Sequence, residues 1–295
     1  MKNIFLFIIS VIIIVITGSS CNSKIVSQKS IDSRGNAMLL GKCKREELEQ
    51  TPYREWFDKN YADYKIDSNA ANKLKENLEG KNFLIFMGTW CGDSRREVPR
   101  MFKLLDYCGV QSSRIQLVML NSYDSVYKQS PTHEERGLNI HRVPDLFVYE
   151  NGKEIGRIVE SPVISLEQDL LDILNKKYVP NYHIVPFLVD LFNTQNPKDI
   201  QTNLNNVAVT AKPLMSNVAE LRSYGHVLMA AGEMDKAMIA FRLNALLYPD
   251  NAGVFDNLGE YYFKTGNKIL AKENYQKLLQ LQPGNANAKK MLGQL

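Results

Sequence analysis

The sequence lacks an excess of charge of either sign. Among 295 residues there are 36 Lys and Arg against 32 Asp and Glu, which gives a formal net charge of +4. The basic residues are interspersed with acidic ones, and no basic stripe carries interleaved aromatic side chains. Such a stripe is the expected footprint of a nucleic-acid-binding surface. We therefore expect no nucleic-acid partner.

Histidine is scarce. The four histidines show no spacing, to one another or to cysteine, that is typical of a metal site: His133, His141, His183 and His226. We therefore expect neither a bound metal nor a cofactor. His141 lies three residues before Pro144 and is expected to be a surface residue.

The chain also lacks an apolar run of the length that crosses a bilayer. The run at 4–16 has thirteen residues, whereas a membrane-spanning helix needs roughly 20. A short run after Lys2 is typical of a secretory signal peptide. Residues 17–21, Thr-Gly-Ser-Ser-Cys, resemble the cleavage site of bacterial lipoproteins. That resemblance implies cleavage after residue 20, lipidation of Cys21, and anchoring by lipid to a membrane of the cell envelope. Plain secretion and an uncleaved anchor are the alternatives.

Cysteine is equally sparse. With Cys21 lipidated, Cys43, Cys91 and Cys108 remain, which is an odd number. Thiols tend to pair in an oxidising compartment, so one disulfide and one free thiol is a possible outcome. Cys108 ends a predicted helix just before Gly109 and is expected to be a buried small hydrophobe. Cys43 is then the candidate internal resolving partner for Cys91.

Residues 90–94, Trp-Cys-Gly-Asp-Ser, are the most informative stretch. The apolar run 83–87 before them predicts a buried strand, and a helical pattern follows over 95–107. Cys91 is therefore expected at a helix N-terminus, where free N–H groups and the helix dipole favour an anion. Such a position makes a thiol nucleophilic. Ser94 cannot close a disulfide with it, so the site could attack a disulfide without resolving the product itself.

Periodicity predicts the neighbouring elements. Helices are expected over 46–64, 69–78, 94–107 and 165–177, and strands over 82–88, 115–120 and on both sides of Asn151-Gly152. The polar stretch 121–139 is expected to carry a short helix at best. The order strand, helix, strand predicts a parallel pair with a helical crossover. Asn-Gly between alternating strands predicts a tight hairpin.

Residues 69–178 together resemble the thioredoxin-fold family. The features that carry the resemblance occur in the family's order: Trp90, Cys91, Pro99 in the following helix, Pro144 at a strand start, and Asn151-Gly152. The resemblance implies an α/β thioredoxin-like domain. It also implies that Cys91 is the nucleophile, that Trp90 shields it, and that Pro144 is a cis-proline that faces it.

The sequence departs from the family pattern at three positions. Ser94 replaces the resolving cysteine, Ile85 stands where many members keep a buried carboxylate, and Asp145 follows the proline where Thr is usual. We expect the Ser94 hydroxyl to hydrogen-bond the Cys91 thiolate without trapping it. The arginines at 95 and 96 are expected to favour the thiolate, and the aspartate at 93 to oppose it.

The last third of the sequence repeats with a period of 34 residues. The same residue types recur at that spacing: Gly225, Gly259 and Gly293; Gly232 and Gly266; Ala237 and Ala271; Phe241 and Tyr275; Pro249 and Pro283. This pattern resembles the tetratricopeptide repeat (TPR) family of paired helices. The resemblance implies an all-α domain with repeats over 218–251 and 252–285 and a truncated third. At least three repeats are normally needed for stability, so we expect the array to stack on connecting helices.

The expected organisation has six parts: a signal peptide at 1–20, a tether at 21–36, a helical extension at 37–68, the thioredoxin-like domain at 69–178, connecting helices at 179–217 and repeats at 218–295. The function expected is monothiol exchange through Cys91, with an external thiol reductant and with disulfide-bearing peptides or protein partners. The alternative is an adaptor without redox activity. A peroxidase is disfavoured, because Thr89 lies two residues before Cys91 rather than three.

Overall fold

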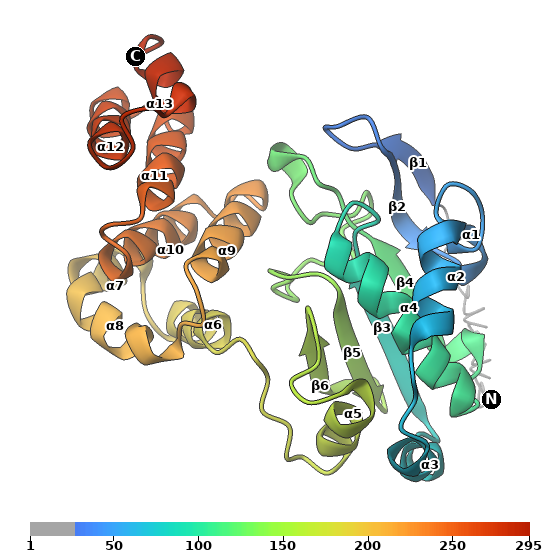
Figure 1. Cartoon of the computed structure of the whole chain (residues 1–295). Coiled ribbons are helices and arrows are strands. Elements are labelled where there is room, and N and C mark those ends of the chain that lie inside the picture. Colours follow the sequence, from blue (N-terminus) through green and yellow to red (C-terminus); the bar gives the residue numbers. More distant parts are fainter. Residues whose placement is uncertain (1–26) are drawn as a thin grey trace, which may run out of the picture.

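The computed structural model describes residues 27–295. The signal peptide, Cys21 and the first part of the tether predicted from the sequence lie outside the described residues. Figure 1 shows an α/β part and an all-helical part, with the chain passing once from the first to the second. The two fold classes expected in succession, α/β and then all-α, are confirmed at that level.

The α/β part is built on one mixed sheet with the strand order β1-β2-β4-β3-β5-β6. The strands are β1 (Gln28–Ile31), β2 (Ala37–Cys43), β3 (Lys81–Met87), β4 (Ile115–Met119), β5 (Asp145–Glu150) and β6 (Lys153–Val159). The pair β3–β4 is parallel, and β5–β6 is an antiparallel hairpin that turns at Asn151-Gly152. Both predictions are confirmed. The polar stretch 121–139 holds only one short 3₁₀ helix, Asp124–Val126, as expected.

The segment before residue 68 differs from the prediction. Residues 37–43 form strand β2, which pairs antiparallel with β4, and part of the expected tether forms β1. The long helix expected over 46–64 is two helices, α1 (Arg45–Leu48) and α2 (Arg54–Asp63). Pro52 lies between them, and a proline has no N–H to donate to a helical ladder. The helical extension is therefore corrected to an edge of the sheet followed by two helices.

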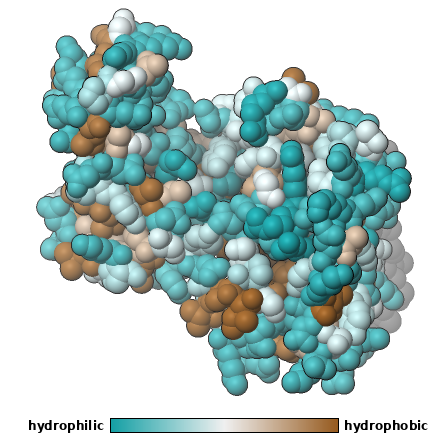
Figure 2. Space-filling view, in the orientation of Figure 1, coloured by the Kyte–Doolittle hydropathy of each residue, from teal (hydrophilic) through white to brown (hydrophobic). Residues whose placement is uncertain are grey.

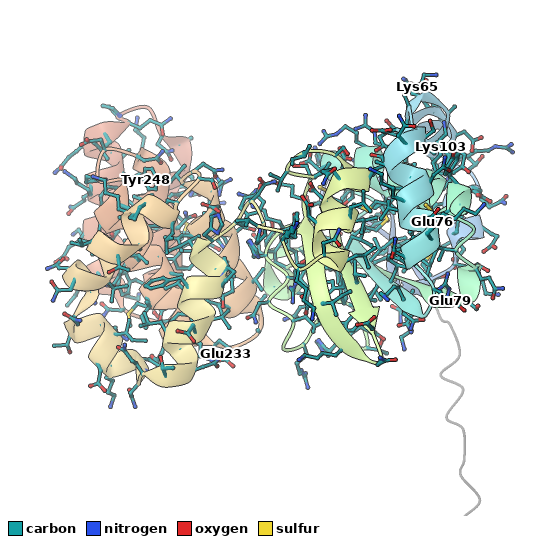
Figure 3. The ribbon with its side chains drawn as sticks, turned by 90° about the horizontal axis from the view of Figure 1, so that it is seen from below. Lys65, Glu76, Glu79, Lys103, Glu233 and Tyr248 are labelled. Atoms are coloured by element: carbon teal, nitrogen blue, oxygen red, sulfur yellow. The ribbon has the colours of Figure 1, made fainter. Side chains whose placement is uncertain are left out.

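Helices cover one face of the sheet. The helices α2, α3 (Ser68–Asn77), α4 (Gly92–Tyr107) and α5 (Leu166–Leu174) pack there on one apolar core with the inward residues of β2 to β6. Lys103 of α4, labelled in Figure 3, donates to the carbonyls of Ala62 and Tyr64 and ties the end of α2 to α4. Four aromatic residues of this segment also pack in or against this core: Trp56, Phe57, Tyr61 and Tyr64.

The opposite face of the sheet carries a second apolar cluster made by Phe86, Val118, Leu120, Ile140, Val143 and Phe147. Trp90 and Cys91 pack against this cluster. The loop that joins β4 to β5 therefore covers the face on which the thiol lies.

The helical part contains α6 (Ile184–Thr194), α7 (Pro197–Thr202), α8 (Leu204–Ala211), α9 (Ala219–Ala230), α10 (Met234–Leu247), α11 (Ala252–Lys264), α12 (Lys268–Leu281) and α13 (Ala286–Leu292). One apolar core runs from α6 to α11, so the hairpins stack on the connecting helices as expected. The helices α10 and α12 each end two residues before the proline of their repeat.

Two glycines explain why the hairpins close so tightly. A Cβ at Gly225 would lie 2.3 Å from the Phe241 ring, and one at Gly259 would lie 2.7 Å from the Tyr275 ring. A glycine and an aromatic ring are thus matched across each hairpin, and the pair recurs 34 residues later along the chain. The 34-residue period of the sequence therefore reflects one packing contact that is repeated in each helical hairpin.

The face of the molecule seen in Figure 2 is mostly hydrophilic, with small hydrophobic patches and a hollow between the upper ends of the two parts. Within residues 27–295, no helix has both the length and the apolar character needed to cross a membrane.

Candidate functional site

The Cys91 thiol lies where the sequence places it, at the turn from β3 to α4. Cys91 is the N-cap residue of α4, and its N–H donates to Gly88 O at 3.0 Å. The side chain is partly buried, and Sγ donates to Val143 O at 3.3 Å. The peptide bond between Val143 and Pro144 is cis. The thiol therefore faces the residue before a cis-proline, as expected.

Trp90 is fixed beside the thiol by a hydrogen bond and a ring contact. Its indole Nε1 donates to Leu120 O at 2.8 Å, at the end of β4. The indole also packs on the Tyr127 ring, with 6.2 Å between the centroids. A Cβ added to Gly88 would lie 2.4 Å from the indole, so this position leaves no room for a side chain. Trp90 thus covers one side of the turn that carries Cys91.

Replacing Gly88 by Ala is expected to displace this indole. The displacement would break the bond to Leu120 and lower the free energy of unfolding by roughly 1–3 kcal/mol. Trp90 fluorescence, recorded in a Trp56→Phe background, should shift to longer wavelength because the ring gains contact with water. Gly92→Ala is the matched control, since an added Cβ there meets nothing within 4 Å. An unchanged emission spectrum in Gly88→Ala would show that the indole is not held as described.

Ser94 does not have the expected partner. Its side chain is fully buried, and its hydroxyl accepts from the Gly88 N–H at 3.3 Å. This bond directs the Ser94 hydroxyl toward the end of β3, because Gly88 immediately follows that strand. The serine therefore supports the backbone of the active turn rather than contacting the thiol.

The two arginines of the first turn of α4 are engaged elsewhere. Arg95 Nε donates to Thr89 O at 2.5 Å. Arg96 pairs with Asp93 at 2.8 Å and with Glu97 at 2.6 Å, and the Arg96 side chain is 43% exposed. Exposed ion pairs are screened by solvent and contribute little. Another cation that interacts with the thiol comes from a different element.

That cation is Lys128, which the sequence analysis missed. Its side chain is buried, and Nζ donates to His141 O at 2.6 Å and to Ser223 Oγ at 2.7 Å. No carboxylate of residues 27–295 forms an ion pair with it. Burial lowers the pKa of Lys128 to about 7, and Cys91 opposes this shift, which places the amine within electrostatic range of the thiol. An amine in such a site titrates near neutral pH.

Helix α9 of the helical part completes the surroundings of Lys128. The hydroxyl of Ser223 donates to His141 O at 2.6 Å, while Tyr224 OH donates to Asn139 Oδ1 at 3.3 Å. Side chains fill the junction between the two parts, which Figure 3 shows from below. The loop opposite the thiol is thus bonded to both parts, so the helical part bears directly on the site.

His141 is buried, which corrects the expectation of a surface histidine. Its ring packs against the rings of Tyr182 and Tyr224, with centroids 5.6 Å and 6.3 Å away. His141 is buried because it lies in the loop before Pro144, and the helical part covers that loop.

Asp145 follows Pro144 and is the most unusual charged group on this face. Its side chain is fully buried at the start of β5, and neither carboxylate oxygen has a hydrogen-bond partner. Arg157 Nη1 of β6 lies 3.7 Å from it. Burial raises the pKa of Asp145 to about 8, although the Arg157 charge opposes this. The carboxyl group is therefore largely protonated at neutral pH.

Cys43 and Cys91 are not brought together. Both are free thiols, and Cys43 of β2 is buried opposite Leu117 of β4, which pairs with Ile85 of β3. Two strand spacings of about 4.8 Å separate Cys43 from Ile85, and Cys91 lies beyond the end of β3. This separation exceeds the ~7 Å between Cα atoms that a disulfide spans. Burial raises the pKa of the Cys43 thiol, and Glu47 adds to the effect.

Cys108 is buried, as expected, and burial raises the pKa of its thiol to about 11. Among residues 27–295, no group of three or more His, Cys, Asp and Glu side chains is placed to hold a metal ion. No family model matches the chain.

Proposed function

We propose that this protein carries out monothiol thiol–disulfide exchange through Cys91 on a thioredoxin-like domain in the cell envelope, to which Cys21 anchors it by lipid. The observation that carries the proposal is the contact of Cys91 Sγ with the carbonyl before cis-Pro144. It puts a helix-capping thiol against the backbone that immediately precedes β5, at one end of the sheet. A thiol held at a helix N-terminus is predisposed to ionise and to attack disulfides.

In the proposed reaction the Cys91 thiolate attacks one sulfur of a substrate disulfide. A bond forms between Cys91 Sγ and that sulfur, the substrate S–S bond breaks, and the other substrate sulfur leaves as a thiolate. An external thiolate then attacks the bound substrate sulfur, which restores the Cys91 thiolate and leaves the external thiol joined to the substrate. Ionisation of Cys91 also frees Val143 O to accept from the backbone N–H of an extended substrate, as in strand addition.

The helical hairpins α9 to α12 are proposed to be TPR-like and to dock the protein partner that carries the disulfide. The helical part contacts the site directly, because the Ser223 hydroxyl of α9 hydrogen-bonds to Lys128 and to His141 O in the loop that faces the thiol. A partner bound to the helical part would therefore lie beside Cys91. This arrangement favours a protein or peptide substrate over a small one.

Selective alkylation tests the proposal. The full chain, carrying Cys21→Ser and purified in detergent, is treated with iodoacetamide from about pH 6 to pH 9, and each cysteine is followed by peptide mapping. We expect Cys91 to react first, and faster than a free cysteine peptide measured in parallel. The buried Cys43 and Cys108 serve as internal controls and should stay unmodified. A Cys91 that reacts no faster than a free cysteine peptide would instead support the redox-inert adaptor.

A further inference from the structure

An exposed apolar patch lies beside α5, in the loop before this helix and in the linker 175–183 after it. Three large aliphatic side chains there face solvent: Val163 is 46% exposed, Ile164 70% and Val179 64%. Figure 2 shows a hydrophobic patch near the lower margin of this face, where the linker runs in Figure 1. The thiol exchange proposed above makes no use of these side chains.

Hydrogen bonds hold the loop and the linker in place. The backbone N–H groups of residues 163 and 164 donate to the Asp169 carboxylate at 2.6 Å and 3.1 Å. The Asn181 side chain donates to Ser161 O at 3.2 Å, which ties the linker to the loop. The aliphatic side chains are therefore presented together by a fixed piece of backbone.

Two lysines of the linker add positive charge to the patch. Lys176 and Lys177 are exposed, and within residues 27–295 neither side chain forms a hydrogen bond or an ion pair. Glu150 lies within electrostatic range of Lys176, but it is paired with Lys81 at 2.6 Å. Asp172 is half-buried and accepts a hydrogen bond within α5. The free charge beside the patch is therefore positive.

Lys176 stands at a position where the chain otherwise uses glycine. The helices α4, α9 and α11 are each followed by a residue with left-handed backbone: Gly109, Gly232 and Gly266, with φ of 75°, 78° and 78°. Lys176 takes this place after α5, with φ of 57°. A residue with a Cβ is less favourable there than glycine. The lysine is thus kept at a cost to the fold, which indicates a role for its charge.

Aliphatic side chains beside lysines suit a lipid surface better than a protein surface. The centres of protein interfaces are enriched in aromatic residues, methionine and arginine, and they are depleted in lysine. The three exposed aliphatic residues and two lysines have the opposite composition. Proteins that lie on a membrane combine apolar side chains that enter the acyl boundary with lysines that face anionic headgroups.

The tether that leads to the proposed anchor is short. The sequence predicts a tether to residue 36, but β1 begins at Gln28. The six residues after Cys21 span at most about 22 Å. Five strand spacings of about 4.8 Å separate β1 from β6, so the sheet is about 24 Å wide. Because the patch follows β6, an anchored chain brings it within reach of the same bilayer.

We propose that the patch made by Val163, Ile164, Lys176, Lys177 and Val179 binds the surface of a bilayer that contains anionic lipid. The inference rests on the proposed anchoring at a membrane and adds a second contact to it. The aliphatic side chains enter the headgroup layer, and the lysines lie at the level of the phosphates. The anchor raises the effective concentration of this weak contact, which then holds the α/β part in one orientation to the membrane.

Vesicle binding tests the proposal without the anchor. A chain that starts at residue 22 lacks the apolar run and Cys21, and it keeps the described fold, which begins at residue 27. We measure its sedimentation with phosphatidylcholine vesicles, with and without phosphatidylglycerol. We expect binding to the anionic vesicles to be about ten-fold tighter or more. No binding at millimolar anionic lipid would overturn the proposal, and so would equal binding to the two kinds of vesicle.

Matched variants locate the contact. The fluorescence of Ile164→Trp should be quenched by brominated lipid, whereas that of Ile269→Trp, at a residue 74% exposed on α12, should not. Lys176→Gly should bind about five-fold more weakly and yet be at least as stable, because glycine suits the left-handed backbone. Lys290→Ala removes an exposed lysine of α13 and should bind as the wild type does. Equal quenching of the two tryptophans, or unchanged binding in Lys176→Gly, would overturn the proposal.

Two further results separate this inference from the proposed function. Cys91→Ser should bind vesicles normally, and a Cys21 found without lipid in cells would refute the anchor while leaving the vesicle result intact. Dimers that form without vesicle binding, and that Ile164→Asp abolishes, would assign the patch to a second copy of the chain and overturn the proposal.

Discussion

Asp145→Asn is expected to stabilise the protein by roughly 2–4 kcal/mol at about pH 8, and to leave its stability nearly unchanged at about pH 4. The reason is the burial of a carboxyl group without hydrogen bonds, whose pKa is raised from 3.8 to about 8. Between these values the folded protein holds a proton that the unfolded chain has released. The free energy of unfolding of the wild type therefore falls as pH rises through this window, by up to about 1.4 kcal/mol per unit.

Asparagine at position 145 keeps the shape of the side chain but has no proton to lose. Urea unfolding at several pH values between about 4 and 8 should show the wild type losing stability with pH and the variant losing much less. Asp250→Asn, at an exposed position after α10, is the control and should follow the wild type. Parallel curves for wild type and Asp145→Asn would mean that Arg157 compensates the buried charge fully.

A stability cost of this size next to Pro144 is informative in itself. Buried unpaired polar groups tend to persist where function needs them, because selection otherwise removes a destabilising residue. The carboxyl group lies on the thiol-bearing face of the sheet, at the start of the strand that Pro144 opens. The sequence shows no carboxylate at Ile85, where the thioredoxin resemblance leads one to look, and the structure places a buried one at Asp145 instead.

The local features of the site could be predicted because each depends on neighbours in the sequence. The strand before Cys91, the helix after it and the Asn151-Gly152 turn are set by periodicity and turn chemistry within a dozen residues. The position of Pro144 opposite the thiol was predicted from the resemblance to a known fold. The spacing of residues in the sequence alone does not predict it. The 34-residue repeat was visible because glycine and aromatic positions recur together.

The missed elements depend on contacts between distant residues. Residues 37–43 form a strand because they pair with β4, which is distant in the sequence. Their apolar run of Met38, Leu39 and Leu40 is too short for hydrophobic periodicity to identify a strand. The polar stretch 121–139 has the composition of a solvated loop, yet Lys128 within it is buried by Ser223, which lies 95 residues later. Burial of this kind is created by the helical part, so no window of the first domain predicts it.

The second large effect is expected at Lys128. Lys128→Met should slow the reaction of Cys91 with iodoacetamide by about ten-fold at pH 7, because a cation within range of a thiolate stabilises it by an amount of the order of 1.4 kcal/mol. Arg142, Arg222 and Glu160 also act on the amine, and the two arginines lower its pKa as burial does. Buried charges are poorly screened, so the difference between wild type and variant should persist in 0.5 M salt.

Stability distinguishes this electrostatic role from a structural one. Because burial depresses the pKa of Lys128 to about 7 from 10.5, the unfolded chain binds more protons between these values. The free energy of unfolding therefore rises with pH across that window, and the penalty of the buried cation is fully present below pH 7. Lys128→Met removes the penalty, while Ser223 continues to bond to His141 O. The variant should thus be more stable than the wild type at pH 6, and yet its Cys91 thiol should react more slowly with iodoacetamide.

Arg222→Met is the matched control for charge. Arg222 is exposed on α9, so its loss should change the alkylation rate less than two-fold, and that small change should vanish in salt. A Lys128→Met protein that is less stable at pH 6 and alkylates at the wild-type rate would show that the lysine only fills the junction. A slower, more stable variant would establish that the helical part holds a cation in place for the thiol. The helical part would then contribute to the chemistry at the thiol, because Ser223 is one of the two groups that fix the amine.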